Sequence, residues 1–417
     1  MITNALRQKV IRVPFLRRSG RAIWELSHTL PRCLPFEKFP ALLRWSGRPV
    51  NYHRTVRDYL TTYPERGWEK IIRPGSSYER VRPSPLGIPL PACFNPPQTV
   101  SWDHEKVTFL EGARYWGGYG GSIIAHDEYL LGELSPDVWG LERHSLFNKL
   151  KLPSIEYFPG LTAVVSTPEA DTNYSHWMID LLPRLELLTL AGYGPERIDR
   201  YLINSGGHPY ERETLALAGI PLEKIHFVSA ASHFRCEHLV TASLRPRHWQ
   251  YSLPAWVPDY LQRLVGLTNK NPPTRRLYLT RNQASFRRVV NEDSLLPVLA
   301  RAGFEVFDPG TKPVREQARL FAEAAVIISP HSSAMTNLVF CRPGVRVLEL
   351  FPADYFDVSF WTAASAIGAQ YFAAMGERVG VLPNTLIQAR RQDIGISFEL
   401  LEEIKSFVST EFPLNAS

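Results

Sequence analysis

The sequence predicts an α/β protein of two Rossmann-like domains facing a cleft, preceded by a basic, irregular N-terminal arm. The chain has 417 residues, which is too long for one ordinary core and suggests two domains of about 150 residues each. Short apolar strands alternate with helical segments from residue 162 to residue 373, as in βαβ units with parallel sheets. The charge is uneven: residues 1–50 hold ten Lys/Arg and two Glu (10 − 2 = +8), which leaves −2 for the remainder because the net charge is +6.

We expect residues 1–100 to form the basic arm and a Pro-rich irregular segment over 51–100, where six prolines lie between Pro83 and Pro97. Trp24 and Trp45 interleave with the basic residues, so the arm could rest on an anionic membrane surface or form a solvated leader. No nucleic-acid-binding motif accompanies the charge, so we expect no nucleic-acid partner. No apolar run approaches the roughly 20 residues of a membrane helix, and no secretory signal is recognisable.

The first domain is expected over residues 101–267. It begins with short strands separated by the Gly-rich turn Gly117–Gly121, which lacks the Lys-Ser/Thr ending of a phosphate loop and which we interpret as a hairpin turn. Alternating elements follow: strands at 162–166, 200–204, 224–228 and 238–242, and helices at 174–190, 211–218 and 254–267.

The second domain is expected over residues 268–417, after a polar stretch at 268–274 that we take as the boundary. Its strands are expected at 276–280, 304–307, 325–329, 345–351 and 370–373, and its helices at 292–302, 314–324, 332–340 and 358–366, with a further C-terminal helix. Two doubly wound halves leave a cleft between them, where ligands of paired α/β domains usually bind.

Two polar residues on the helix at 174–190 are candidates for catalysis. His176 and Asp180 are four residues apart and share one face, and Pro183 should loosen the helix near Ile179. Asp180 could accept a proton from an acceptor hydroxyl, and His176 could do the same or orient Asp180. The alternative is that the two side chains simply pair.

A basic loop follows the first strand of the second half. Arg281 and Asn282 come directly after the strand, and Arg287 lies further along the loop. Ligands of open α/β sheets bind beyond the carboxyl ends of strands, and guanidinium groups offer paired donors that suit a diphosphate. The alternative is a solvated basic loop.

The turn at 329–337 joins a strand to a short helix and could cradle an anion. His331, Ser332, Ser333 and Asn337 belong to it, and its small serines would let a pyrophosphate approach the helix N-terminus. The alternative is an ordinary Ser N-cap.

Glu349, near the end of the next strand, could bind two ribose hydroxyls, or be a surface residue. The chain has no D-x-D, so we expect no metal and no cofactor: Arg side chains and a helix N-terminus would neutralise the diphosphate.

These motifs, in this order, resemble glycosyltransferase family 61, the family related to capsular polysaccharide biosynthesis proteins. The resemblance spans roughly residues 105–375 and rests on NYSHWMIDLLPRLELL, RRLYLTRNQASFRRVVNED and EQARLFAEAAVIISPHSSAMTNLVFCRPGVRVLELF. The family usually reads H-G-A-G-L-T-N at the turn, where this chain reads HSSAMTN. That difference motivates one alternative function, a catalytically inactive assembly protein of polysaccharide biosynthesis that binds nucleotide sugars or glycans.

The resemblance implies a GT-B fold and an inverting, metal-independent transfer of a hexose or pentose from a nucleotide sugar, most often a UDP-sugar, to a glycan or polysaccharide acceptor. It implies that the second half holds the donor through Arg281, the turn at 331–337 and Glu349, and that Asp180 or His176 lies near the reacting centre. Relatives include bacterial cytoplasmic and eukaryotic luminal enzymes. With no anchor or signal recognised, we expect a cytoplasmic enzyme, at most peripheral at the inner membrane face.

Overall fold

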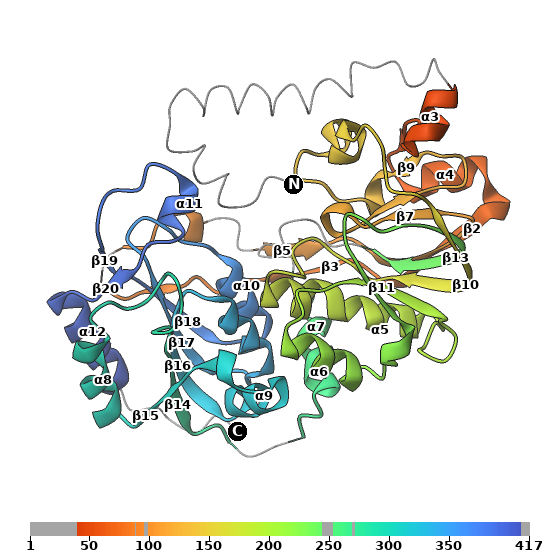
Figure 1. The fold of residues 1–417 in the computed structure, drawn as a ribbon. Coiled ribbons are helices and arrows are strands. Elements are labelled where there is room, and N and C mark those ends of the chain that lie inside the picture. Colours follow the sequence, from red (N-terminus) through yellow and green to blue (C-terminus); the bar gives the residue numbers. More distant parts are fainter. Residues whose placement is uncertain (1–39, 88, 96–98, 244–252, 269–271, 410–417) are drawn as a thin grey trace.

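The structure is a computed structural model that describes residues 40–87, 89–95, 99–243, 253–268 and 272–409 (Figure 1). The α/β class predicted from the sequence is confirmed: helices pack around two large sheets, one of ten strands and one of six. The expected arm over residues 1–39 lies outside the described residues. No helix of the described ranges is long and apolar enough to cross a membrane.

The ten-stranded sheet is mixed, which corrects the prediction of a parallel first sheet. Strands β12, β11, β10 and β13 are mutually parallel, whereas β6 and β7 run antiparallel to β13. The Gly-rich turn joins β7 to the antiparallel β8, as predicted, and such short connections permit only antiparallel neighbours. The strands are β1 (Tyr52–His53), β2 (Gly67–Arg73), β6 (Glu105–Glu111), β7 (Arg114–Trp116), β8 (Ser122–Ile124), β9 (Leu130–Leu131), β10 (Glu156–Val164), β11 (Arg200–Asn204), β12 (Ile225–Val228) and β13 (His233–Ala242).

The helix that follows β10 begins with an unusual turn. Residues His176–Leu181 form a π-helical turn (η8) before α5 (Leu182–Leu190), and the N–H of Leu182 donates to the carbonyl of Trp177, five residues back. Pro183 explains the wide turn, because it has no N–H and its ring pushes the preceding turn apart. Two further helices, α6 (Pro209–Leu217) and α7 (Trp256–Leu264), complete this half.

Arg184 fastens α5 to the sheet. Its guanidinium is buried and donates to the carbonyls of Ser166, Val164 and Ala242 at 2.6–3.1 Å, near the carboxyl ends of β10 and β13. Backbone carbonyls thus accept hydrogen bonds from a buried cation, which fixes α5 directly after the π-helical turn that carries His176 and Asp180.

The six-stranded sheet is entirely parallel, in the order β15-β14-β16-β17-β18-β4. The order reverses between β14 and β16, the switch point at which such sheets bind ligands. The strands are β14 (Arg275–Leu279), β15 (Phe304–Phe307), β16 (Ala324–Pro330), β17 (Arg346–Phe351), β18 (Gln370–Met375) and β4 (Ser84–Pro85). The helices are α8 (Glu292–Arg301), α9 (Val314–Ala322), η12 (Ser333–Phe340), α10 (Ser359–Ala366) and α12 (Phe398–Ser409).

The prediction of an irregular segment over 51–100 is wrong for most of its length. It contains α4 (Val56–Thr62), β1, β2, β3 (Ser76–Glu79) and the start of β5 (Thr99–Trp102). The prolines that motivated the prediction begin only at Pro83, and Thr55 and Asp58 form a capping box that starts α4. Because β4 joins the second sheet while β1 and β2 join the first, this segment contributes to both halves.

Candidate active site

Polar side chains from the two signature motifs meet between the two halves. The hydroxyls of Ser175 and Thr336 lie 2.6 Å apart, and the hydroxyl of Tyr174 donates to Asn337 Oδ1 at 2.7 Å. Asn337 Nδ2 in turn donates to Gln317 Oε1 at 2.6 Å. Asn337 is fully buried and bonded through both ends of its amide. The expectation that it contacts a donor is therefore corrected: its amide is used up in the joint between the halves.

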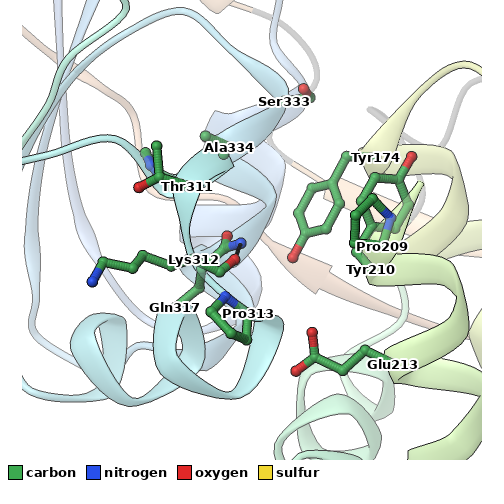
Figure 2. Close-up of a pocket in the computed structure, with 12 residues that line it drawn as sticks. Tyr174, Pro209, Tyr210, Glu213, Thr311, Lys312, Pro313, Gln317, Ser333 and Ala334 are labelled. Carbon is green, nitrogen blue, oxygen red and sulfur yellow. Dashed lines mark hydrogen bonds between the residues drawn. The ribbon is translucent and has the colours of Figure 1, made fainter.

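A cavity of about 430 Å³ opens beside this joint (Figure 2). Tyr174 and Tyr210 line one side, and Thr311 and Lys312 line the other. Glu213 closes the junction from α6, because its carboxylate accepts the N–H groups of residues 314 and 315 at 2.8 and 3.0 Å and so caps α9.

A second cavity, of about 270 Å³, lies at the switch point between β14 and β16. Arg281, Ser332 and Ser333, three residues predicted to bind an anion, all line it. It shares Ser333 and Ala334 with the larger cavity, so the two hollows adjoin. Asn282 does not line it: this side chain is exposed, and its N–H donates to the hydroxyl of Thr280.

Arg281 and Arg287 carry largely buried positive charges at this end of β14. Arg281 donates to the carbonyl of Phe286 at 3.1 Å, and the guanidinium of Arg287 lies 5.0 Å from the Phe286 ring. Within the described ranges neither forms an ion pair, and the Nε of each is buried without a hydrogen-bond partner. Burial, with repulsion from Arg281 and Arg390, lowers the pKa of Arg287 to about 10. The loop thus places a buried and a half-buried guanidinium near each other, whereas Asn282 and Arg288 of the same loop are exposed.

Ser332 precedes η12 but does not cap it. Its side chain makes no capping bond, and its hydroxyl is buried without a hydrogen-bond partner. Ser333 is partly exposed in both cavities. The ordinary Ser N-cap considered from the sequence is therefore wrong, and an unused hydroxyl stands at the cationic site.

His331 is supported from behind by a buried carboxyl group. Its Nδ1 lies 2.5 Å from Glu349 Oε1, and the hydroxyl of Tyr371 donates to the other Glu349 oxygen. Burial raises the pKa of Glu349 and, with nearby Arg287 and Arg281, lowers the pKa of His331. Glu349 is fully buried. The expected ribose contact is corrected, because both of its oxygens are engaged beneath the surface and it positions His331 instead.

His176 stands between two carboxylates. Its Nδ1 lies 2.7 Å from Asp180 Oδ2, and its Nε2 lies 3.4 Å from Glu169 Oε2. Burial lowers the pKa of His176, but the hydrogen bonds to Asp180 and Glu169 outweigh this and raise it to about 9. The two carboxylates thus favour the protonated form of His176, which places Asp180 ahead of His176 as the candidate base.

Glu169 was not predicted from the sequence. It precedes the His176 motif and adopts φ = +64°, a left-handed conformation that is uncommon for a non-glycine residue and costly unless the surroundings impose it. Its side chain is 48% exposed, against 11% for Asp180. The sequence feature that could have identified Glu169 is its position just beyond the strand expected at 162–166.

The two adjoining cavities, with Arg281, Ser332 and Ser333 lining the smaller one, form the candidate site. The model of the family described as Glycosyltransferase 61 matches residues 174–348, which include the His176 helix, the Arg281 loop and the turn at His331. The protein is a glycosyltransferase. Over these residues the chain is similar to glycosyltransferase family 61, the family that the motifs resemble. No curated protein matches the chain.

Proposed function

We propose that this glycosyltransferase moves a sugar from a UDP-sugar to a hydroxyl of a glycan or polysaccharide acceptor, with inversion and without a metal ion, between two halves arranged as in a GT-B enzyme. The observation that carries the proposal is the pair of largely buried arginines, Arg281 and Arg287, which have no acidic partner within ion-pair distance among the described residues. Polysaccharide synthesis, including capsule formation, is the process in which such a transfer would serve.

The donor half is proposed to hold the diphosphate. A buried guanidinium without a counter-ion is costly, so the site at Arg281 and Arg287 favours an anion that brings its own charges. Planar paired donors match phosphate oxygens, and the unused hydroxyl of Ser332 offers one more donor at the same switch point. As the sugar–phosphate bond breaks, the negative charge that develops on the diphosphate meets donors already in place.

The acceptor half is proposed to take up the proton. The acceptor oxygen forms a bond to the anomeric carbon on the face opposite the diphosphate, while the bond from that carbon to the diphosphate oxygen breaks and its electron pair leaves with the diphosphate. The acceptor proton passes to Asp180, the first candidate, or to Glu169, which is more exposed. His176 holds both carboxylates in place through its two ring nitrogens.

The test is release of UDP from a panel of UDP-sugars, with oligosaccharide acceptors and with EDTA present. Arg287→Gln should abolish donor-dependent release, whereas Arg301→Gln, on the exposed end of α8, should leave it unchanged. Turnover that requires an added divalent ion would contradict the metal-independent mechanism. Turnover that survives Arg287→Gln would contradict the assigned diphosphate site.

A further inference from the structure

An excursion of the chain projects from the second half. Strand β19 (Glu377–Arg378) pairs with β20 (Ile394–Gly395), and α11 (Leu386–Ala389) lies between them. Two ion pairs hold its base, Arg378 with Asp354 at 2.7 Å and Arg288 with Asp393 at 2.7 Å. Thr385 caps α11 through its side chain. The excursion is thus an ordered element that extends away from the sheet (Figure 1).

The outer part of this excursion is apolar and basic. Four of its side chains, Val381, Leu382, Leu386 and Ile387, are 62–87% exposed. Residues 379–392 contain no Asp or Glu, and Arg390 and Arg391 are exposed beside the apolar group. Single exposed apolar residues are ordinary on protein surfaces, but four within seven positions, flanked by cations, mark an interaction site.

A similar surface lies on the first half, at α3 (Pro40–Ser46). Trp45 and Leu150 are 55% and 54% exposed, and the ammonium of Lys151 lies 4.9 Å from the Trp45 ring. Arg44 and Lys149 are exposed next to them. An indole ring among basic side chains is typical of side chains that settle at a membrane interface.

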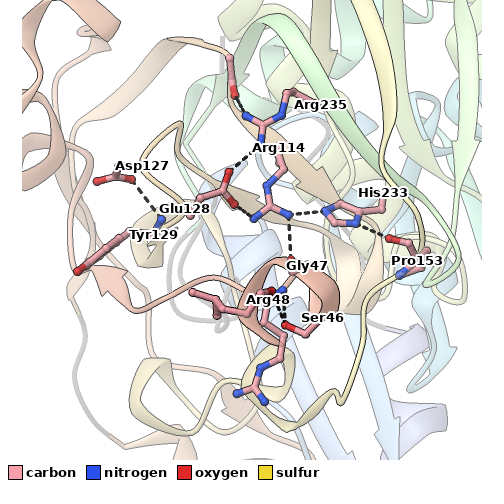
Figure 3. A network of polar contacts seen from close by, with 12 residues as sticks. Ser46, Gly47, Arg48, Arg114, Asp127, Glu128, Tyr129, Pro153, His233 and Arg235 are labelled. Carbon is pink, nitrogen blue, oxygen red and sulfur yellow. Dashed lines mark hydrogen bonds and ion pairs between the residues drawn. The ribbon is translucent and has the colours of Figure 1, made fainter. Parts of the chain in front are cut away.

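A buried network fixes this second surface (Figure 3). Arg114 donates to the carbonyl of Gly47 at 2.9 Å, lies 2.9 Å from His233 Nε2, and pairs with Glu128. Burial, together with Arg114, lowers the pKa of His233 to about 4, so its neutral ring donates through Nδ1 to the carbonyl of Pro153 at 2.8 Å. Trp45 therefore stands on an anchored segment and its exposure is built into the fold.

We propose that the end of the molecule carrying α3 and α11 docks on an anionic lipid membrane, with the apolar residues of α11 and Trp45 in the interface and the flanking cations on lipid phosphates. Both elements lie in the upper part of Figure 1, one on each half. Separate apolar projections flanked by cations suit a charged plane better than one continuous protein interface.

The experiment is co-sedimentation of the full chain with vesicles of phosphatidylcholine alone and of phosphatidylcholine mixed with the anionic lipid phosphatidylglycerol. The wild-type chain should bind the anionic vesicles, and raising the salt concentration should release it. The double variant Leu386→Ser/Ile387→Ser and the variant Trp45→Ser should each lower partitioning by about tenfold or more, because each removes apolar area from the interface. Val306→Ser, at an equally exposed position on β15 (54%), is the matched control and should bind as the wild type does.

Equal binding to both vesicle types would overturn the proposal, as would binding that survives all three substitutions and therefore rests on segment 1–39 alone. Self-association that these substitutions abolish, without vesicle binding, would assign the surface to a second copy of the chain and also overturn it. The substituted residues lie outside the proposed donor site, so donor-dependent thermal shifts should persist in every variant. Loss of the donor-dependent thermal shift in a variant would indicate misfolding, and circular dichroism of the same variants checks for it.

Discussion

Replacing Arg287 by Met should make the protein more stable and, at the same time, unable to bind its donor. The folded environment lowers the pKa of Arg287 from 12.5 to about 10. At about 1.4 kcal/mol for each tenfold change in proton affinity, the charge costs the unliganded fold about 3 kcal/mol. The folded protein holds this proton less tightly than the unfolded chain does. The penalty is therefore complete at pH 7, below both pKa values, and fades as the pH rises through about 10.

Methionine keeps an apolar stem against Phe286 but removes the charge. The free energy of unfolding of the unliganded Arg287→Met variant should rise by up to about 3 kcal/mol, or several degrees in Tm at about 2 °C per kcal/mol. Denaturant unfolding followed by circular dichroism measures the gain. Differential scanning fluorimetry with UDP-sugars measures the loss of donor binding, because a donor at about 100 times its Kd stabilises a competent site by roughly 2.7 kcal/mol.

The matched control is Arg301→Met, at the exposed C-terminal end of α8, which should change stability by less than about 1 kcal/mol and keep the donor shift. An Arg287→Met variant that is less stable without ligand and still shows the donor-dependent rise in Tm would contradict this prediction. That result would mean that Arg287 is an ordinary structural cation with a favourable environment.

Three further outcomes follow from the site. Asp180→Asn should keep donor binding and lose sugar transfer. Glu169→Gln, measured beside it, decides which of the two carboxylates takes the proton. Near-normal transfer by both variants would exclude both residues as the base. The pKa of His176 is raised from 6.5 to about 9, so its charge stabilises the fold by about 3 kcal/mol below pH 6.5, and this is lost as the pH rises through about 9. His176→Gln should flatten that part of a stability-against-pH curve, and an unchanged curve would contradict the pairing. Tyr174→Phe removes the bond to Asn337 and should cost about 1 kcal/mol of unfolding free energy, whereas a neutral result would show that this bond does not join the halves.

The alternation of apolar strands and amphipathic helices predicted most of the second half well. Strand β15 of this half has the predicted bounds, and so has strand β11 of the first half. The mixed first sheet was missed, since its antiparallel strands are two to seven residues long and too short to show a period. The domain boundary at 268–274 and the basic arm stay predictions.

The candidate site was predictable where position along a strand decides it. Arg281, Ser332 and Ser333 follow strands and meet at one sheet edge, as expected of a doubly wound half. The roles of Asn337 and Glu349 were not predictable, because a polar residue next to a site can face the ligand or the core, and only tertiary contacts decide which. Nor could the protonation of His176 be predicted, because it depends on Glu169, which lies in a loop seven residues earlier.

The most direct test of the central claim is a thermal-shift panel of nucleotide sugars against the unmodified chain with EDTA present. A rise in Tm with UDP-sugars that needs no metal, and that is lost in Arg287→Met, is the predicted result. A rise that appears only after a divalent ion is added, or that persists in Arg287→Met, would contradict a diphosphate site built from the chain's own arginines.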